Sequence, residues 1–275
     1  MGVLRIREKT HMSRTHTTSL EKSLALLRGI VADGGRTPFN EIAAGLDLPL
    51  STAYRLASQL VDAGFASRYG PNLYGPGLAA TLLYSQSDAS AHITRVARPL
   101  LKQLSQETGL TSHLGILESG MVTYKIRIPG RPPRAASFTR EGMQLEAYCS
   151  ALGKVLLAGL QDADLDDYLH EGAFVPLTPH TLIEPASLKQ EILKTRQTGF
   201  AIDDREVSED MICLAVPVAG PLGETVAAVS VSMLVGRGQN TDPMGFHPFL
   251  ETCARTLGEL LGAPRDAAQE ADQRS

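Results

Sequence analysis

The sequence lacks long apolar runs and has few cysteines. No window approaches eighteen consecutive apolar residues, which excludes a membrane-spanning helix, and the basic first eighteen residues lack the apolar core of a secretory signal. The three cysteines, Cys149, Cys213 and Cys253, are far apart and have no histidines at metal-ligand spacing. We therefore expect a cytoplasmic protein with no metal site and no membrane partner.

The common catalytic and nucleotide-binding motifs are also missing. GxGxxG, the P-loop, HExxH and GxSxG do not occur. Ser150 and Lys154 resemble a Ser/Lys catalytic pair, but their spacing is one residue longer than SxxK and no third member is evident. We therefore expect no enzyme and no cofactor, and a Ser/Lys-type enzyme is the least favoured alternative.

Charge is unevenly distributed along the chain, whose net charge is −4. Residues 1–90 hold 9 Lys and Arg against 7 Asp and Glu, whereas residues 91–275 hold 17 against 23. A mildly basic head on an acidic body suits a protein whose head binds DNA, although the contrast alone is small. Residues 1–18 are predicted to be a disordered tail, either solvated or touching DNA phosphates, with Met12 an alternative start to Met1.

Apolar residues recur at helical spacing near the start of the chain. Spacings of 4, 3 and 4 from Leu20 to Val31 predict a helix with Ser19 as its N-cap and an end at Gly34-Gly35. Thr37 is the predicted N-cap of a second short helix, with Pro38 at its first helical position and Gly45 and Asp47 breaking it after barely two turns.

A third predicted helix, residues 49–63, has a polar face that is short of carboxylates. Its hydroxyl, amide and guanidinium groups donate to phosphates and base edges. After Gly64 two short strands turn at Gly70-Pro71-Asn72, where a wing would follow a recognition helix. An ordinary three-helix unit with a polar face is the alternative. It is less favoured, because the three helices and the hairpin occur in the order and with the lengths of a winged helix-turn-helix. The predicted DNA-binding residues are Ser51, Thr52, Tyr54, Arg55, Ser58 and, in the wing, Arg68.

Beyond the wing the periodicity changes from helical to strand-like. Residues 78–107 are predicted to be helical in two pieces, with Pro99 either a kink or a late helix start. Alternation from Thr111 predicts a hairpin that turns at 118–120. Further strands are expected over 211–218 and 225–234, and further helices over 151–160, 186–198 and 248–261, with an irregular stretch before the second of these helices.

These elements predict an α+β chain: an N-terminal winged helix-turn-helix, then a domain with an antiparallel sheet and flanking helices. The expected boundaries are 1–18 for the disordered basic tail, 19–77 for the winged helix-turn-helix, 78–92 for a linker helix, 93–262 for the second domain and 263–275 for a disordered tail.

Several motifs give the chain a resemblance to a known family. Leu48-Pro49-x-Ser51-Thr52-Ala53-Tyr54-Arg55-Leu56 resembles the DNA-binding half of the IclR family of bacterial transcription regulators, although Leu50 stands where the family often has a basic residue. The resemblance covers residues 19–262 and implies a GAF-like effector domain, operator DNA as a partner, and homodimers or dimers of dimers. Its markers in the second half are Ser150-Ala-Leu-Gly-Lys154, Thr178-Pro-x-Thr181, Gly199-Phe-Ala-Ile-Asp-Asp204, Cys213-Leu-Ala-Val-Pro-Val218 and Val229-Ser-Val-Ser232.

The resemblance also implies where a small carboxylic acid would bind. A helix N-terminus suits a carboxylate, and serines two apart on a strand face the same side. An aspartate accepts hydrogen bonds, so it suits the hydroxyl of a hydroxy acid, a hydrated keto acid or a phenolic acid. The positions carried over are the amides of Ala151 and Leu152, the carboxylate of Asp203, Cys213, and the hydroxyls of Ser230 and Ser232.

Each of these positions also has a purely structural interpretation. Ser230 and Ser232 can bond the backbone across the sheet, Cys213 can be plain core, and Asp203 can be a turn residue. Tyr148 stands where many relatives have His, so the resemblance predicts a different pocket mouth. Regulators of aromatic-acid catabolism sometimes have Tyr at this position, which favours a phenolic effector. The sequence thus predicts a regulator, activator or repressor, whose DNA binding responds to a small acid; a ligand-independent DNA-binding repressor is the alternative.

Overall fold

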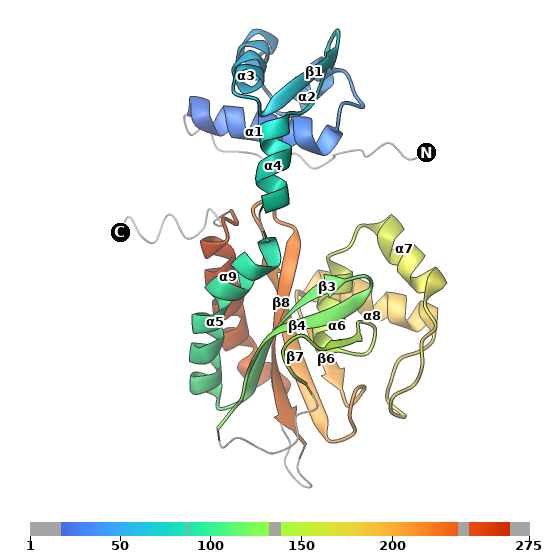
Figure 1. Cartoon of the computed structure of the whole chain (residues 1–275). Coiled ribbons are helices and arrows are strands. Elements are labelled where there is room, and N and C mark those ends of the chain that lie inside the picture. Colours follow the sequence, from blue (N-terminus) through green and yellow to red (C-terminus); the bar gives the residue numbers. More distant parts are fainter. Residues whose placement is uncertain (1–17, 87, 132–138, 236–241, 265–275) are drawn as a thin grey trace. The chain divides into compact units, whose positions relative to one another are not determined.

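The computed structural model of the chain describes residues 18–86, 88–131, 139–235 and 242–264 (Figure 1). Contacts divide the chain into two compact units, Met1–Asp88 and Ala89–Ser275. Most of the two tails that the sequence predicts lies outside the described residues. No helix within the described ranges is long and apolar enough to cross a membrane.

The first unit begins with helix α1 (Ser19–Asp33), which has a complete capping box. The Thr18 hydroxyl accepts the Glu21 N–H at 3.2 Å, and the Glu21 carboxylate accepts the Thr18 N–H at 2.6 Å. The predicted cap at Ser19 is therefore wrong by one residue. Gly34, with a φ of 66°, ends the helix in the left-handed conformation, which confirms the predicted end.

Helices α2 (Phe39–Gly45) and α3 (Leu50–Asp62) follow, each with a proline at its N-cap position. The prediction of Thr37 as the cap of α2 is wrong, because Pro38 occupies that position. The Thr37 hydroxyl instead donates to the carboxylate of Asp33 at the end of α1.

Strands β1 (Ala66–Gly70) and β2 (Leu73–Pro76) pair antiparallel and form the predicted wing, with Asn72 at a φ of 59° in the turn. Helix α4 (Leu78–Gln86) follows. The winged helix-turn-helix is thus confirmed. Its core consists of Leu26, Ile30, Phe39, Ala43, Ala53, Leu56, Ala57, Ala66 and Tyr74.

The described part of the second unit contains a six-stranded antiparallel sheet with the order β5-β4-β3-β8-β7-β6. The antiparallel sheet confirms the predicted α+β class. Two short edge strands, β5 and β6, had not been predicted as strands. The six strands of this sheet are β3 (Thr111–Glu118), β4 (Met121–Ile128), β5 (Gln144–Glu146), β6 (Ala201–Asp204), β7 (Met211–Ala219) and β8 (Thr225–Leu234).

Helices cover both faces of this sheet (Figure 1). One face packs against α5 and α9 around Leu101, Leu214 and Leu257. The other packs against α6, which is covered by α8 and then α7 in a core that includes Leu157 and Leu165. The helices are α5 (Ala89–Thr108), α6 (Ala151–Ala158), α7 (Asp162–Glu171), α8 (Pro185–Thr198), the 3-10 turn η1 (Pro243–Phe246) and α9 (His247–Leu260).

The helices of the second unit differ from the predictions in several places. Pro99 lies inside α5, so the late helix start is wrong, and residues 89–92 belong to α5 rather than to a linker helix that continues α4. Helix α6 ends at Ala158 because Gly159 is its C-cap. The expected irregular stretch contains α7, whose acidic sequence buries only two leucines.

Candidate functional site

The polar face of α3 is exposed in the first unit. Burial of Ala53, Leu56 and Ala57 turns the opposite side of the helix outward. Asp62 is the only carboxylate on α3, so the exposed face carries mostly hydroxyl and guanidinium donors, as a recognition helix requires. Of the predicted DNA-binding residues, Ser51, Tyr54, Arg55, Ser58 and Arg68 are exposed, and Thr52 is half-buried.

Tyr54 also holds the wing in place. Its hydroxyl donates to Asn72 Oδ1 at 2.8 Å, and Asn72 Nδ2 donates to Asn40 Oδ1 at 2.7 Å. The Tyr54 ring packs against Phe39, with the ring centroids 5.0 Å apart. The hydroxyl hydrogen of Tyr54 is therefore occupied within the unit and is not free for DNA.

One cavity in the second unit collects all six residues predicted to bind an effector. It lies between the sheet and the N-terminus of α6, and its empty volume is about 280 Å³. The strand register explains the convergence: Asp203, Cys213 and Ser232 form one row across β6, β7 and β8. Ser230 lies two residues away on the same face of β8, and the first turn of α6 supplies the other two residues.

The N-terminus of α6 presents backbone donors to this cavity. Ser150 caps the helix by accepting the Gly153 N–H at 3.1 Å, while the first two N–H groups, of Ala151 and Leu152, have no acceptor within the helix. A Cβ on Gly153 would lie 2.0 Å from the Ala147 carbonyl oxygen, so this close approach needs glycine. Free N–H groups and the positive end of the helix dipole suit an anion.

Asp203 is buried beside the cavity and holds a loop. Its Oδ1 accepts the N–H of Glu206 at 2.7 Å and that of Val207 at 3.3 Å. Burial, with a smaller contribution from the Glu206 carboxylate, raises the pKa of Asp203 to about 7, against the lowering effects of those hydrogen bonds and of the charge of Lys154. Asp203 therefore stabilises a turn, as the structural interpretation of this residue expects, and it also lines the cavity.

Three further polar side chains line the same wall. Cys213 Sγ and Ser232 Oγ are 3.1 Å apart, so Ser232 bonds a neighbouring side chain rather than the backbone across the sheet. Burial raises the pKa of the Cys213 thiol, which therefore stays protonated. Ser230 is buried and makes no side-chain hydrogen bond to another described residue, so its hydroxyl is free for a ligand.

A buried ion pair braces α6 against the loop that follows β6. Lys154 Nζ pairs with Glu206 Oε1 and donates to the Ile202 carbonyl oxygen at 3.1 Å. The Thr181 hydroxyl holds the same loop by donating to the Glu206 carbonyl oxygen at 2.7 Å. Lys154 is thus committed to Glu206 rather than to Ser150, unlike the lysine of a Ser/Lys catalytic pair, which must reach its serine.

The sequence patterns missed five further residues in the wall of the cavity. They come from β3, β4, the start of β7 and the loops after β4 and β6. The alternation along β3 predicted a hairpin, but it carried no signal for the pairing of β3 with β8, which places the β3 histidine opposite Ser230. The missed residues are His113, Tyr124, Thr139, Val207 and Met211.

His113 is the most unusual of these residues because it is a buried, neutral imidazole. Its Nε2 lies 3.0 Å from Thr139 Oγ1, and its ring meets that of Tyr124 edge-on, with centroids 5.3 Å apart. Burial, aided by the positive charge of Arg127, lowers the pKa of His113 to about 3.

Tyr148 does not line the cavity. Its hydroxyl donates to the Val175 carbonyl oxygen at 2.7 Å and accepts the Val175 N–H at 3.0 Å. Its ring packs edge-on against Phe174. The expectation that Tyr148 shapes the ligand pocket is therefore wrong, and this residue gives no argument for a phenolic ligand.

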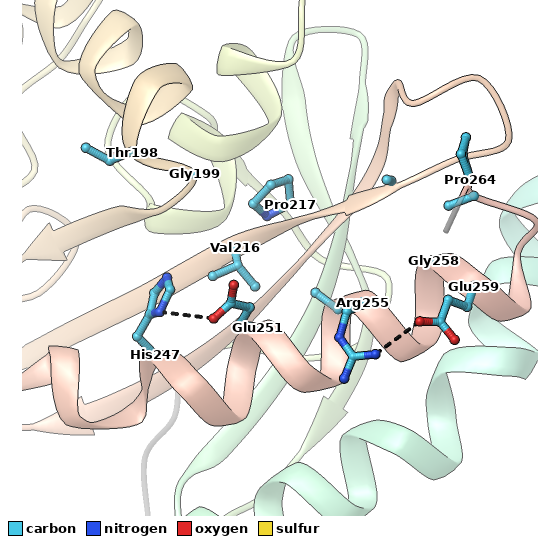
Figure 2. Close-up of a pocket in the computed structure, with 13 residues that line it drawn as sticks. Thr198, Gly199, Val216, Pro217, His247, Glu251, Arg255, Gly258, Glu259 and Pro264 are labelled. Carbon is cyan, nitrogen blue, oxygen red and sulfur yellow. Dashed lines mark hydrogen bonds and ion pairs between the residues drawn. The ribbon is translucent and has the colours of Figure 1, made fainter. Parts of the chain in front are cut away.

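A second, more open hollow lies between α9 and β7 (Figure 2). Its charged side chains are paired along α9: Arg255 with Glu259 at 3.0 Å, and His247 with Glu251 at 3.8 Å. None of the predicted site residues lines it, so we place the candidate site in the cavity beneath α6. The described residues include no cluster of three or more potential metal ligands.

Both units match models of one protein family. The model described as bacterial transcriptional regulator IclR C-terminal matches residues 86–259, and the IclR helix-turn-helix domain matches residues 19–69. The HTH-type transcriptional regulator XynR of Escherichia coli is 30% identical over 247 residues, which cover 90% of this chain and 98% of XynR.

Solved structures have the same fold. IclR of Thermotoga maritima is 27% identical, with a TM-score of 0.59, over 90% of this chain and 100% of that one. An IclR homologue from Microbacterium hydrocarbonoxydans, crystallised with 4-hydroxybenzoate, has a TM-score of 0.58 over 89% of this chain and 99% of that one. At 20% identity the second likeness shows the fold alone.

Proposed function

The chain belongs to the IclR family of bacterial transcriptional regulators, and from this we propose that a small carboxylic acid in the cavity beneath α6 controls its affinity for operator DNA. One observation carries the proposal. Six residues that are scattered over the sequence, and that were predicted together as an effector site, line a single cavity.

The polar groups of the cavity favour a small acid with a hydroxyl. No Lys or Arg is among the described lining residues, so the donors to a carboxylate are the amides of Ala151 and Leu152 and the serine hydroxyls. With a pKa of about 7, Asp203 donates to a carboxylate when protonated and accepts from a hydroxyl when ionised. The 4-hydroxybenzoate bound by the Microbacterium homologue is an acid of this kind.

DNA binding is proposed to use α3 and the wing. Arg55 and Thr52 would face base edges in the major groove, and a symmetric operator would need two such helices. Leu20 and Leu24 on α1 and Leu83 on α4 are 67%, 49% and 58% exposed, which supports burial against a second copy. We therefore propose a homodimer or a dimer of dimers.

A thermal-shift screen of the full chain against hydroxy, keto and phenolic acids tests this function. We expect an acid that raises the Tm of the wild type, raises that of Ser230→Ala less, and changes DNA affinity without being consumed. No shift with any acid would favour the ligand-independent repressor. Turnover of an acid would instead indicate an enzyme.

A further inference from the structure

One polar atom in the wall of the cavity has no partner. His113 Nδ1 is buried and makes no hydrogen bond to another described residue, although Nε2 of the same ring lies 3.0 Å from Thr139 Oγ1. Buried polar side-chain atoms in folded proteins nearly always have a partner, and an unpaired one is destabilising. Because His113 lines the cavity, a bound ligand is in a position to supply the partner.

His113 and Asp203 lie on different strands in the wall of the cavity. His113 is on β3 and Asp203 is on β6, and the order β3-β8-β7-β6 places these strands three positions apart. At the usual strand spacing this is roughly 14 Å between the backbones. Ser230 on β8 lies between them, directly opposite His113 in the register. The polar groups of the cavity therefore lie in two neighbouring rows across the sheet, with Asp203, Cys213 and Ser232 in one row and Ser230 and His113 in the next.

We infer that His113 is a specificity-determining residue, which hydrogen-bonds a hydroxyl of the bound acid through Nδ1. This inference rests on the proposed acid-binding function. A neutral imidazole has one donor and one acceptor, and the bond to Thr139 decides which of these Nδ1 offers. A ligand hydroxyl can donate to Nδ1 or accept from it, so it suits either tautomer of His113. A second carboxylate can only accept, so it suits only the tautomer with the hydrogen on Nδ1.

A carboxylate bound by the amides of Ala151 and Leu152, together with a hydroxyl bound by His113 Nδ1, would use both kinds of polar group in the cavity. An acid without a hydroxyl, such as benzoate, leaves His113 Nδ1 unpaired.

Calorimetric titration of the full chain with 4-hydroxybenzoate, benzoate and pyruvate tests the inference. We expect the wild type to bind 4-hydroxybenzoate at least about tenfold more tightly than benzoate, because only the former satisfies Nδ1. His113→Phe keeps a ring of similar size without nitrogen atoms. We expect this variant to bind 4-hydroxybenzoate and benzoate with equal affinity.

Ser112→Ala is the matched control. Ser112 precedes His113 on β3, is equally buried, and donates its hydroxyl hydrogen to the Leu101 carbonyl oxygen at 2.9 Å on the other face of the sheet. We expect this variant to be less stable and to keep the preference for 4-hydroxybenzoate. Where His113→Phe does not fold, His113→Asn replaces it, and we expect a reduced preference for 4-hydroxybenzoate over benzoate.

Three results would overturn the inference. The first is equal binding of the two aromatic acids by the wild type. The second is a variant at His113 that keeps the full preference for 4-hydroxybenzoate. The third is a wild type that binds pyruvate and neither aromatic acid. The last result leaves the proposed function intact. If no acid binds in either the titrations or the thermal-shift screen, the proposed function itself fails, and the role of His113 fails with it.

Discussion

Asp203 should make the folded chain less stable as the pH rises. Its pKa is raised to about 7 in the folded chain, whereas an aspartate in an unfolded chain has a pKa of about 3.9. Between these values the unfolded state has lost a proton that the folded state keeps, so each increase in pH favours unfolding. The stabilising effect is fully present below about pH 4 and is lost as the pH rises to about 7.

The size of the effect follows from the width of this interval. One pH unit within it corresponds to about 1.4 kcal/mol, so the two units from pH 5 to 7 cost roughly 2–3 kcal/mol of the free energy of unfolding. Asp203→Asn cannot ionise, and its side-chain oxygen can still accept the N–H groups of Glu206 and Val207. We therefore expect the variant to lack this part of the pH dependence.

Urea unfolding followed by circular dichroism at pH 5, 6, 7 and 8, at one protein concentration, measures the effect. We expect the wild type to lose about 2–3 kcal/mol more than Asp203→Asn between pH 5 and 8. Asp204→Asn is the control, because its exposed carboxylate pairs with Arg205 at the surface, and it should follow the wild type. Parallel curves for the wild type and Asp203→Asn would refute the reasoning, since Asp203 would then be ionised throughout.

Three further predictions concern DNA binding and stability. Arg55→Ala and Thr52→Ala should each weaken operator binding, by roughly 1–3 kcal/mol for a base-contacting side chain, without changing the melting curve. If fluorescence anisotropy at fixed salt shows unchanged affinity for both variants, α3 is not the recognition helix. Lys154→Met strands the buried carboxylate of Glu206 and should cost about 3–5 kcal/mol in urea unfolding; adding Glu206→Gln should recover much of the loss, and no recovery would contradict the ion-pair explanation. A fragment of residues 1–90 should bind the operator much more weakly than the full chain, because one module buries little surface; full affinity of a monomeric fragment would argue against a dimer.

The first unit could be predicted from the sequence because its boundaries depend on neighbouring residues. The proline before α2, the glycines after α1 and the turn of the wing act within a few positions. The cap of α1 could have been predicted, because Thr18 and Glu21 have the spacing of a capping box. The cap of α2 was wrong because Thr37 is suitable by type, and only its contact with Asp33, which the pattern does not contain, places it elsewhere.

The second unit depends on contacts between distant residues. The family resemblance predicted the six residues of the cavity, but spacing alone did not bring them together. His113 was missed because its place depends on the pairing of β3 with β8, far away in the sequence. The buried pair of Lys154 and Glu206 was missed because charged residues of these types usually lie at the surface. Helix α7 was missed because its apolar stripe is only two residues long.

The effect of an acid on DNA affinity tests the central claim most directly. Operator fragments selected in vitro by the full chain would be titrated with the chain at fixed salt, with and without a saturating concentration of the acid that gives the largest thermal shift. We predict a change of about fivefold or more in the Kd for DNA, and a smaller change for Ser230→Ala at the same acid concentration. An identical Kd with and without every acid that stabilises the chain would contradict the claim that this cavity regulates DNA binding.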